Sequence, residues 1–160
     1  MDEKIVVPLD GSKIGEAALP YVEELVSKLS PEVNVEITLL QVVPKTPAQI
    51  DSGEAGVPVI DYSDKEIEVH RNKAIEYLNR VGESLRSTRA TVISRVEVGN
   101  APEEITRVAD EINANIIAIS THGRSGLSRW AFGSVTDKVL KLEGRIPITM
   151  VKAPKEAMRA

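Results

Sequence analysis

Cysteine is absent from this chain of 160 residues. Its absence excludes disulfide frameworks, thiol nucleophiles and cysteine-ligated zinc sites. Aromatic residues are also scarce, at 3% of the chain, whereas Val, Ile, Leu and Ala supply most of a hydrophobic fraction of 42%. This composition is typical of a sheet covered by helices rather than of an aromatic-rich recognition surface.

The chain also lacks a long basic run and a long apolar run. Its 20 Lys and Arg residues stand against 24 Asp and Glu residues, for a net charge of −4, so nonspecific binding to nucleic acid or to anionic membranes is not expected. The first apolar stretch, Ile5 to Leu9, is too short for a signal-peptide core or a membrane span. We therefore expect a cytoplasmic protein with no membrane partner and no nucleic-acid partner.

Apolar runs alternate with helical patterns along the chain. The predicted strands are residues 5–9, 33–43, 91–98, 115–119 and 146–151. Apolar residues at helical spacing predict helices between them, over residues 12–29 and 63–86, after Asn100 and from near Ser134. This alternation predicts an α/β fold, a doubly wound five-stranded parallel sheet with helices on both faces. The length suits a single domain at residues 1–152, followed by a polar, frayed tail at 153–160.

Three local features qualify this outline. Pro20 falls inside the first predicted helix, where we expect a kink costing about 3 kcal/mol. Asn100 and Glu103 have the spacing of a capping box at the start of the third helix. The stretch 44–60 carries Pro and Gly and is typical of an extended loop.

Residues 115–136 run from the fourth predicted strand through a glycine-rich loop into the last helix. The loop glycines that allow close approach of backbone to a ligand are Gly123, Gly126 and Gly133. Arg124 and Arg129 add positive charge. At the helix start, phosphate can bind the backbone N–H groups of Gly133, Ser134 and Val135. The segment therefore predicts an anion site, with ordinary loop glycines as the alternative.

Several other kinds of site are not supported. No Gly-Lys-Ser/Thr follows the spacing of a Walker A loop, and no Gly-x-Gly-x-x-Gly follows the first strand. His70 and His122 are isolated, so they predict no metal site. No nucleophile is paired with a base, and we assign no catalytic residue.

The second candidate loop follows the first strand and reads Pro8-Leu9-Asp10-Gly11-Ser12. A carboxylate at a strand terminus can accept hydrogen bonds from ribose hydroxyls. Alternatively, Asp10 and Ser12 form an Asx-type turn that caps the first helix. Ligands of doubly wound sheets bind beyond the carboxyl ends of the strands, so we expect this turn and the glycine loop to converge.

The glycine loop resembles the nucleotide-binding signature of the universal stress protein family, which is Gly, two residues, Gly, nine residues, then Gly-Ser or Gly-Thr. Here nine residues separate Gly123 from Gly133-Ser134, whereas Ser120 occupies the place of the first glycine. The hydroxymethyl group of Ser120 either crowds a nucleotide or donates a hydrogen bond to it. The resemblance extends from Lys4 to Val151.

This resemblance implies the adenine nucleotide alpha hydrolase-like fold, with strand order 3-2-1-4-5. It places Pro8 and Asp10 against the nucleoside and the backbone of Val42 against the adenine ring. Gln41 precedes Val42, where many relatives have histidine. The full set of implied binding residues is Pro8, Leu9, Asp10, Gly11, Ser12, Val42, Ile119, Ser120, Thr121, His122, Gly123, Arg124, Gly126, Gly133, Ser134 and Val135.

The resemblance further implies a regulatory or sensor protein that binds ATP or another adenine nucleotide with Mg²⁺. As an enzyme it would be at most a slow or partner-dependent ATPase. Its implied partner is a second copy of the chain, paired through residues 146–151. Two alternatives remain: a nucleotide-independent dimeric scaffold of the same fold, and an ATP-using phosphoryl or nucleotidyl transferase.

Overall fold

Five parallel strands form one sheet in the computed structural model of the chain, which describes residues 1–47, 61–86, 88–121, 134–142 and 144–158. The strands are β1 (Asp2–Pro8), β2 (Asn34–Val43), β3 (Thr91–Val98), β4 (Ile116–Thr121) and β5 (Ile148–Lys152). Their order across the sheet is β3-β2-β1-β4-β5, and each neighbouring pair is parallel. The predicted strand order is confirmed.

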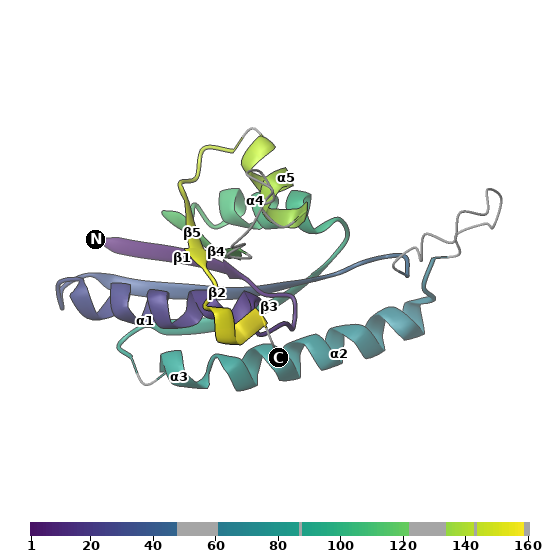
Figure 1. Cartoon of the computed structure of the whole chain (residues 1–160), viewed down its shortest axis with the longest axis horizontal. Coiled ribbons are helices and arrows are strands. Elements are labelled where there is room, and N and C mark those ends of the chain that lie inside the picture. Colours follow the sequence, from purple (N-terminus) through teal and green to yellow (C-terminus); the bar gives the residue numbers. More distant parts are fainter. Residues whose placement is uncertain (48–60, 87, 122–133, 143, 159–160) are drawn as a thin grey trace.

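Helices cover both faces of the sheet, with α1 and α2 on one side and α4 and α5 on the other (Figure 1). The helical elements are η1 (Gly15–Ala17), α1 (Ala18–Lys28), α2 (Asp64–Val81), α3 (Glu83–Arg86), α4 (Ala101–Glu111), α5 (Ser134–Lys141) and η2 (Lys155–Met158). Within the described ranges, no helix is both long enough and apolar enough to cross a membrane.

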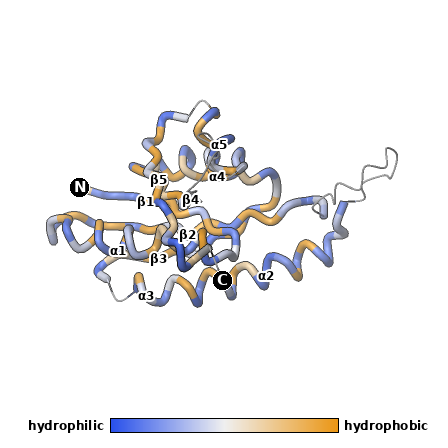
Figure 2. Tube along the Cα trace, in the orientation of Figure 1, coloured by the Kyte–Doolittle hydropathy of each residue, from blue (hydrophilic) through white to orange (hydrophobic). Residues whose placement is uncertain are grey.

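β1 is buried on both faces because it lies at the centre of the sheet. Ile5 and Val7 pack toward α1 and α2, whereas Val6 packs toward α4, and all three side chains are fully buried. Figure 2 shows hydrophobic residues along the central strands and a predominantly hydrophilic α2. A run of β-branched residues without polar alternation is therefore explained by burial on two sides.

The first helix departs from its prediction. The α-helix begins at Ala18 rather than near residue 12, and the 3₁₀ turn η1 precedes it. Pro20 is thus the third residue of α1, in the first turn, where a backbone N–H has no partner within the helix. A proline at this place removes no hydrogen bond from within α1, so the expected cost of about 3 kcal/mol for a proline in a helix interior does not apply.

Helix capping also differs from the prediction. The Asn100 side chain makes no capping hydrogen bond to α4, although the helix does begin directly after it, at Ala101. A capping box is found instead at α2, where Ser63 and Glu66 each accept a hydrogen bond from the other's backbone N–H. The C-terminal segment, expected to fray, contains η2.

The predicted helix over residues 63–86 is divided at Gly82. A Cβ atom at Gly82 would lie 2.7 Å from Leu39 Cδ1 and 3.0 Å from the carbonyl oxygen of Leu78. Glycine is needed because the chain passes close to β2 at this point. The helical segment α3 follows and buries Leu85.

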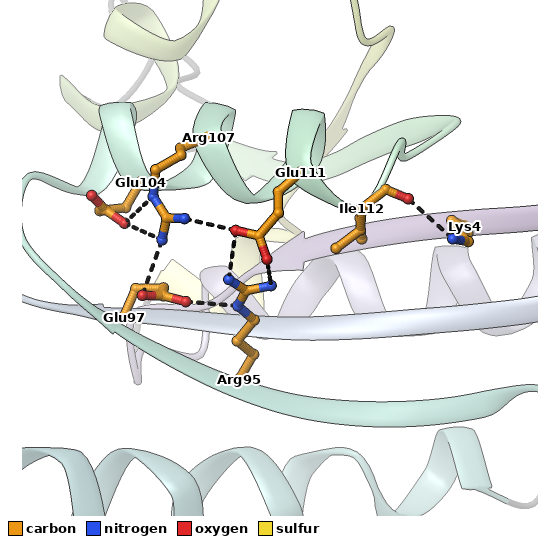
Figure 3. A network of polar contacts seen from close by, with 7 residues as sticks. All are labelled: Lys4, Arg95, Glu97, Glu104, Arg107, Glu111 and Ile112. Carbon is orange, nitrogen blue, oxygen red and sulfur yellow. Dashed lines mark hydrogen bonds and ion pairs between the residues drawn. The ribbon is translucent and has the colours of Figure 1, made fainter.

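An ion-pair network joins the edge strand β3 to α4 (Figure 3). The Arg95 guanidinium donates to Glu97 Oε1 at 2.7 Å and to both carboxylate oxygens of Glu111 at 3.0 Å. Arg107 of α4 pairs with Glu97 at 3.0 Å and with Glu104 and Glu111 at 2.7 Å. These charges occupy the face of β3 turned toward α4, whereas Val92 and Val96 of the same strand pack against the core on the opposite face.

Hydrogen bonds from Arg95, together with the positive charges of Arg95 and Arg107, hold the pKa of Glu111 below its ordinary value of 4.5. The folded pKa therefore lies below the unfolded one. The resulting stabilisation is present above about pH 4.5 and is lost as the pH falls through the folded pKa of Glu111.

We predict that Arg95→Met lowers the free energy of unfolding at pH 7 and that this difference from the parent shrinks below pH 4.5. Urea unfolding across that pH range measures it. Lys155→Met, which makes the same change in charge at an exposed residue of η2, serves as the control. A difference that stayed constant with pH would show that Arg95 acts through packing of its aliphatic stem.

Candidate functional site

A cavity of about 330 Å³ lies beyond the carboxyl ends of β1, β2 and β4. From β1 the chain builds the sheet outward in two directions, through β2 to β3 and through β4 to β5. The cavity therefore lies at the point where the strand order reverses, which is the usual ligand position in doubly wound folds. Its volume is in the range that accommodates small ligands.

The structure brings together residues from both predicted loops. Those that line the cavity are Pro8, Leu9, Asp10, Val42, Ile119, Ser120, Ser134 and Val135. Three neighbours do not line it: Gly11 faces a second cleft, Ser12 holds the turn, and Thr121 is buried in the sheet. Five other predicted binding residues lie outside the described ranges, namely His122, Gly123, Arg124, Gly126 and Gly133.

Several wall residues were not anticipated. They are Ile14, Gly15, Leu40, Gln41, Pro44, Ala101, Ile105 and Thr136. Ala101 and Ile105 belong to α4, whose contribution depends on how that helix packs over the sheet. The apolar periodicity of α4 could have identified Ile105 as buried, but not as part of a cavity wall.

Asp10 forms the mouth of the cavity on the β1 side. Its Oδ1 accepts hydrogen bonds from the Ser12 backbone N–H at 2.9 Å and from Ser12 Oγ at 2.6 Å, while Gly11 has a φ of +85°. This is the predicted Asx-type turn. Within the part of the chain that the structure describes, Asp10 Oδ2 accepts no hydrogen bond, so it is available to a ligand hydroxyl.

The turn is anchored through η1. Ser12 Oγ accepts a hydrogen bond from the Gly15 N–H at 3.0 Å, and Ser120 Oγ of β4 donates to the Gly15 carbonyl at 2.9 Å. A Cβ atom at Gly15 would lie 2.7 Å from Asp10 Oδ1. The hydroxyl of Ser120 thus bonds to the protein itself and fixes η1 against β4, a contact that the sequence did not predict.

Tyr77 of α2 supports η1 from the other side. Its hydroxyl donates to Glu16 Oε1 at 3.4 Å. Burial, followed by the negative charges of Glu16 and Asp10, raises the pKa of Tyr77 well above its ordinary range. The phenol is therefore a neutral donor to Glu16 at neutral pH.

An open groove continues from the cavity past Ser134 and Val135 at the start of α5. Lys45 and Lys138 line it, but so do the acidic residues Glu103 and Glu104. Across the described ranges, no group of three or more His, Asp or Glu side chains is arranged to hold a metal ion. The described part of the site therefore offers backbone donors and single charges.

Comparison with known proteins identifies the family. The model of the universal stress protein family matches residues 1–152. The chain belongs to the universal stress protein family. Its relatives include two proteins of Methanocaldococcus jannaschii. Universal stress protein MJ0577 is 31% identical, with 95% of this chain and 96% of the relative covered. Universal stress protein MJ0531 is 26% identical, with 96% and 84% covered.

Solved structures of the family have the same architecture. The structure of MJ0577 matches with a TM-score of 0.74 at 25% identity, covering 96% of this chain and 97% of that one. A family protein from Arabidopsis thaliana, solved with AMP bound, matches with a TM-score of 0.62 at 16% identity over 96% and 94% of the two chains. The predicted adenine nucleotide alpha hydrolase-like fold is thereby confirmed.

We predict that Gly15→Ala destabilises the protein by about 1–3 kcal/mol, since the added methyl group would overlap the Asp10 carboxylate. Thermal or urea unfolding measures this change. Gly144→Ala is the matched control, because its Cβ would meet only Thr106 Cγ2 at an ordinary 3.5 Å. Equal stability of the two variants would mean that the Asp10 turn moves aside freely.

Proposed function

We propose that this universal stress protein binds ATP or another adenine nucleotide and acts as a regulatory or sensor module. The observation that carries the proposal is the cavity at the strand-order reversal, bounded by the Asp10 turn and the start of α5. The AMP bound to the plant relative, and the cAMP bound to another universal stress protein of TM-score 0.60, support it.

The apolar side of the cavity suits a base. The Leu9 N–H donates to the Leu40 carbonyl at 2.8 Å, and this is the last backbone hydrogen bond between the segment that ends β1 and β2. Alternate residues of a strand direct their peptide groups to the same side. The N–H and C=O of Val42 therefore point past the end of β1, where they offer a donor and an acceptor to the edge of an adenine ring.

The other end of the cavity suits phosphates. Backbone N–H groups at the first turn of α5, beginning at Ser134, lack partners within the helix and favour an anion. Since the protein has a net charge of −4, the negative charge of ATP needs local compensation. We propose that Mg²⁺ enters with the phosphates rather than through a site built from side chains.

We propose that Asp10, which lines the cavity between these two ends, accepts a hydrogen bond from a ribose hydroxyl. Any hydrolysis is proposed to be slow or dependent on a partner, since the hydroxyl that a carboxylate holds here, Ser12 Oγ on Asp10, belongs to a residue that does not line the cavity. Binding would act as a signal if the nucleotide favours one conformation over another.

We predict micromolar affinity for ATP with Mg²⁺, about −8 kcal/mol. Replacing Asp10 by Ala removes a charged acceptor and should weaken binding by roughly tenfold or more. Titration calorimetry measures both affinities, and Asp110→Ala, on the exposed surface of α4, is the control. Absence of both heat and thermal shift at millimolar ATP would instead favour the nucleotide-independent scaffold.

We further propose that two copies pair through β5, which forms one edge of the sheet. The Pro147 carbonyl accepts from Ile117 N–H, and Ala153 N–H donates to the Thr121 carbonyl, both toward β4. By alternation, the peptide groups of Met150 face outward. The Met150 side chain is also 43% exposed, and an unpaired strand edge is a ready partner for a second strand.

Met150→Pro should therefore convert a dimer into a monomer, because proline removes the outward N–H without breaking a bond to β4. Light scattering at tens of micromolar protein distinguishes a species of 17.4 kDa from one of twice that mass. Met150→Ala retains the N–H and should remain dimeric. A parent protein that is monomeric under these conditions would exclude the β5 interface.

A further inference from the structure

Among the side chains that the structure describes, Gln41 Oε1 is the buried polar atom that has no hydrogen-bond partner. A buried acceptor left unpaired is destabilising, and native proteins rarely retain one without a reason. Gln41 lies in β2, one residue before Val42. Its position at the ligand cavity suggests that the missing donor belongs to a ligand.

Gln41 is shared by two adjoining cavities. It lines the cavity described above and also a second cleft of about 290 Å³ on the α2 side of the sheet. Side chains alternate along β2, so that of Gln41 lies on the same face as Leu39, toward α2. Gly11, Lys73 and Tyr77 form the facing wall of the second cleft. Gln41 therefore borders both the cavity and the second cleft, next to Val42.

We propose that the Gln41 side-chain carbonyl accepts a hydrogen bond from the amino group at C6 of a bound purine and so selects a 6-amino purine over a 6-oxo purine. This inference rests on the proposed nucleotide function and concerns the specificity of the same site. It assigns recognition of the base to the Gln41 side chain, in addition to the backbone groups of Val42.

The position of the amide favours the base over the other parts of a nucleotide. Gln41 lines the second cleft together with Val42 and does not line the groove at the start of α5, where Ser134 lies at the end proposed for phosphate. An exocyclic amino group carries two hydrogens. One can be donated to the Val42 carbonyl, which leaves the other for Gln41 Oε1.

An acceptor at this place discriminates by chemistry. ATP presents an amino donor at C6 and an unprotonated N1, whereas inosine triphosphate presents an oxygen at C6 and an N–H group at N1. The difference at N1 acts on the parent and on Gln41→Met alike, so the change in preference between these two proteins measures the contribution of Gln41. Two facing acceptors cannot form a hydrogen bond, so the oxo purine would leave both oxygens unpaired in a buried position. Unpaired buried groups of this kind give binding sites their strongest discrimination.

The test is titration calorimetry of ATP and of inosine triphosphate, each with Mg²⁺, on the parent protein and on Gln41→Met. The methionine has a similar size but cannot accept the bond. We expect the parent's preference for ATP over inosine triphosphate to fall by about tenfold in Gln41→Met, the scale of one unmatched buried group. Lys65→Met, at an exposed residue of α2 that lines neither cavity, should leave that preference unchanged.

Each outcome has a separate meaning. An equal preference in the parent and in Gln41→Met, with ATP still bound, would overturn the assignment to Gln41 and leave the proposed function standing. A parent that prefers inosine triphosphate would also overturn it, because the amide nitrogen would then face the base. Failure of both nucleotides to bind the parent would overturn the proposed function and this inference with it.

The thermal midpoint of the ligand-free protein provides the folding control. Gln41→Met removes a buried acceptor without a partner, so the midpoint of this variant should be equal to or higher than that of the parent. A lower midpoint together with an unchanged nucleotide preference would assign Gln41 a purely structural role.

Discussion

Burial of β1 on both of its faces is the constraint on which the remaining structure depends. Ile5 and Val7 require helices on one face of the sheet and Val6 requires them on the other, so the connections between successive strands run over both faces. With β2 and β4 as neighbours, β1 occupies the point where the strand order reverses. The cavity is therefore a consequence of how the core is built.

The ligand site is fixed by short-range bonds at the end of this central strand. Asp10 is held by Ser12, and η1 is held by hydrogen bonds between Gly15 and both Ser12 and Ser120. The hydrogen bond from Ser120 joins η1, in the segment that follows β1, to β4. The strand order reverses between β1 and β4. A hydroxyl at position 120 thus contributes to the cavity wall and to the rigidity of the turn at once.

Polar side chains on β3 and β2 differ in whether they have partners. At β3 the charges of Arg95 and Glu97 are matched by those of α4, which lets an edge strand carry charged residues toward a helix. At β2 the Gln41 carbonyl has no such match among the described residues. The contrast suggests that the two positions serve different purposes, the first for stability and the second for recognition.

Much of this protein was determined by its sequence alone. The order of strands and helices could be predicted because apolar residues recur at strand or helix spacing along the chain. This spacing is a local property of the sequence and does not depend on how the elements pack. The Asx turn at Asp10 could also be predicted from the sequence, since it depends on two residues that lie two positions apart. For the same reason, the family signature could be recognised from the spacing between Gly123 and Ser134.

Only the tertiary structure decided which distant groups meet. The start of α1 at Ala18 depends on η1, which is held by Ser120 from 105 residues away. The pairing of Arg95 with Glu111 and the unpaired state of Gln41 Oε1 likewise depend on how helices dock on the sheet. Such contacts cannot be predicted from the spacing of apolar residues in the sequence. Each depends on how two elements pack against each other, and not on the helix or strand propensity of either element.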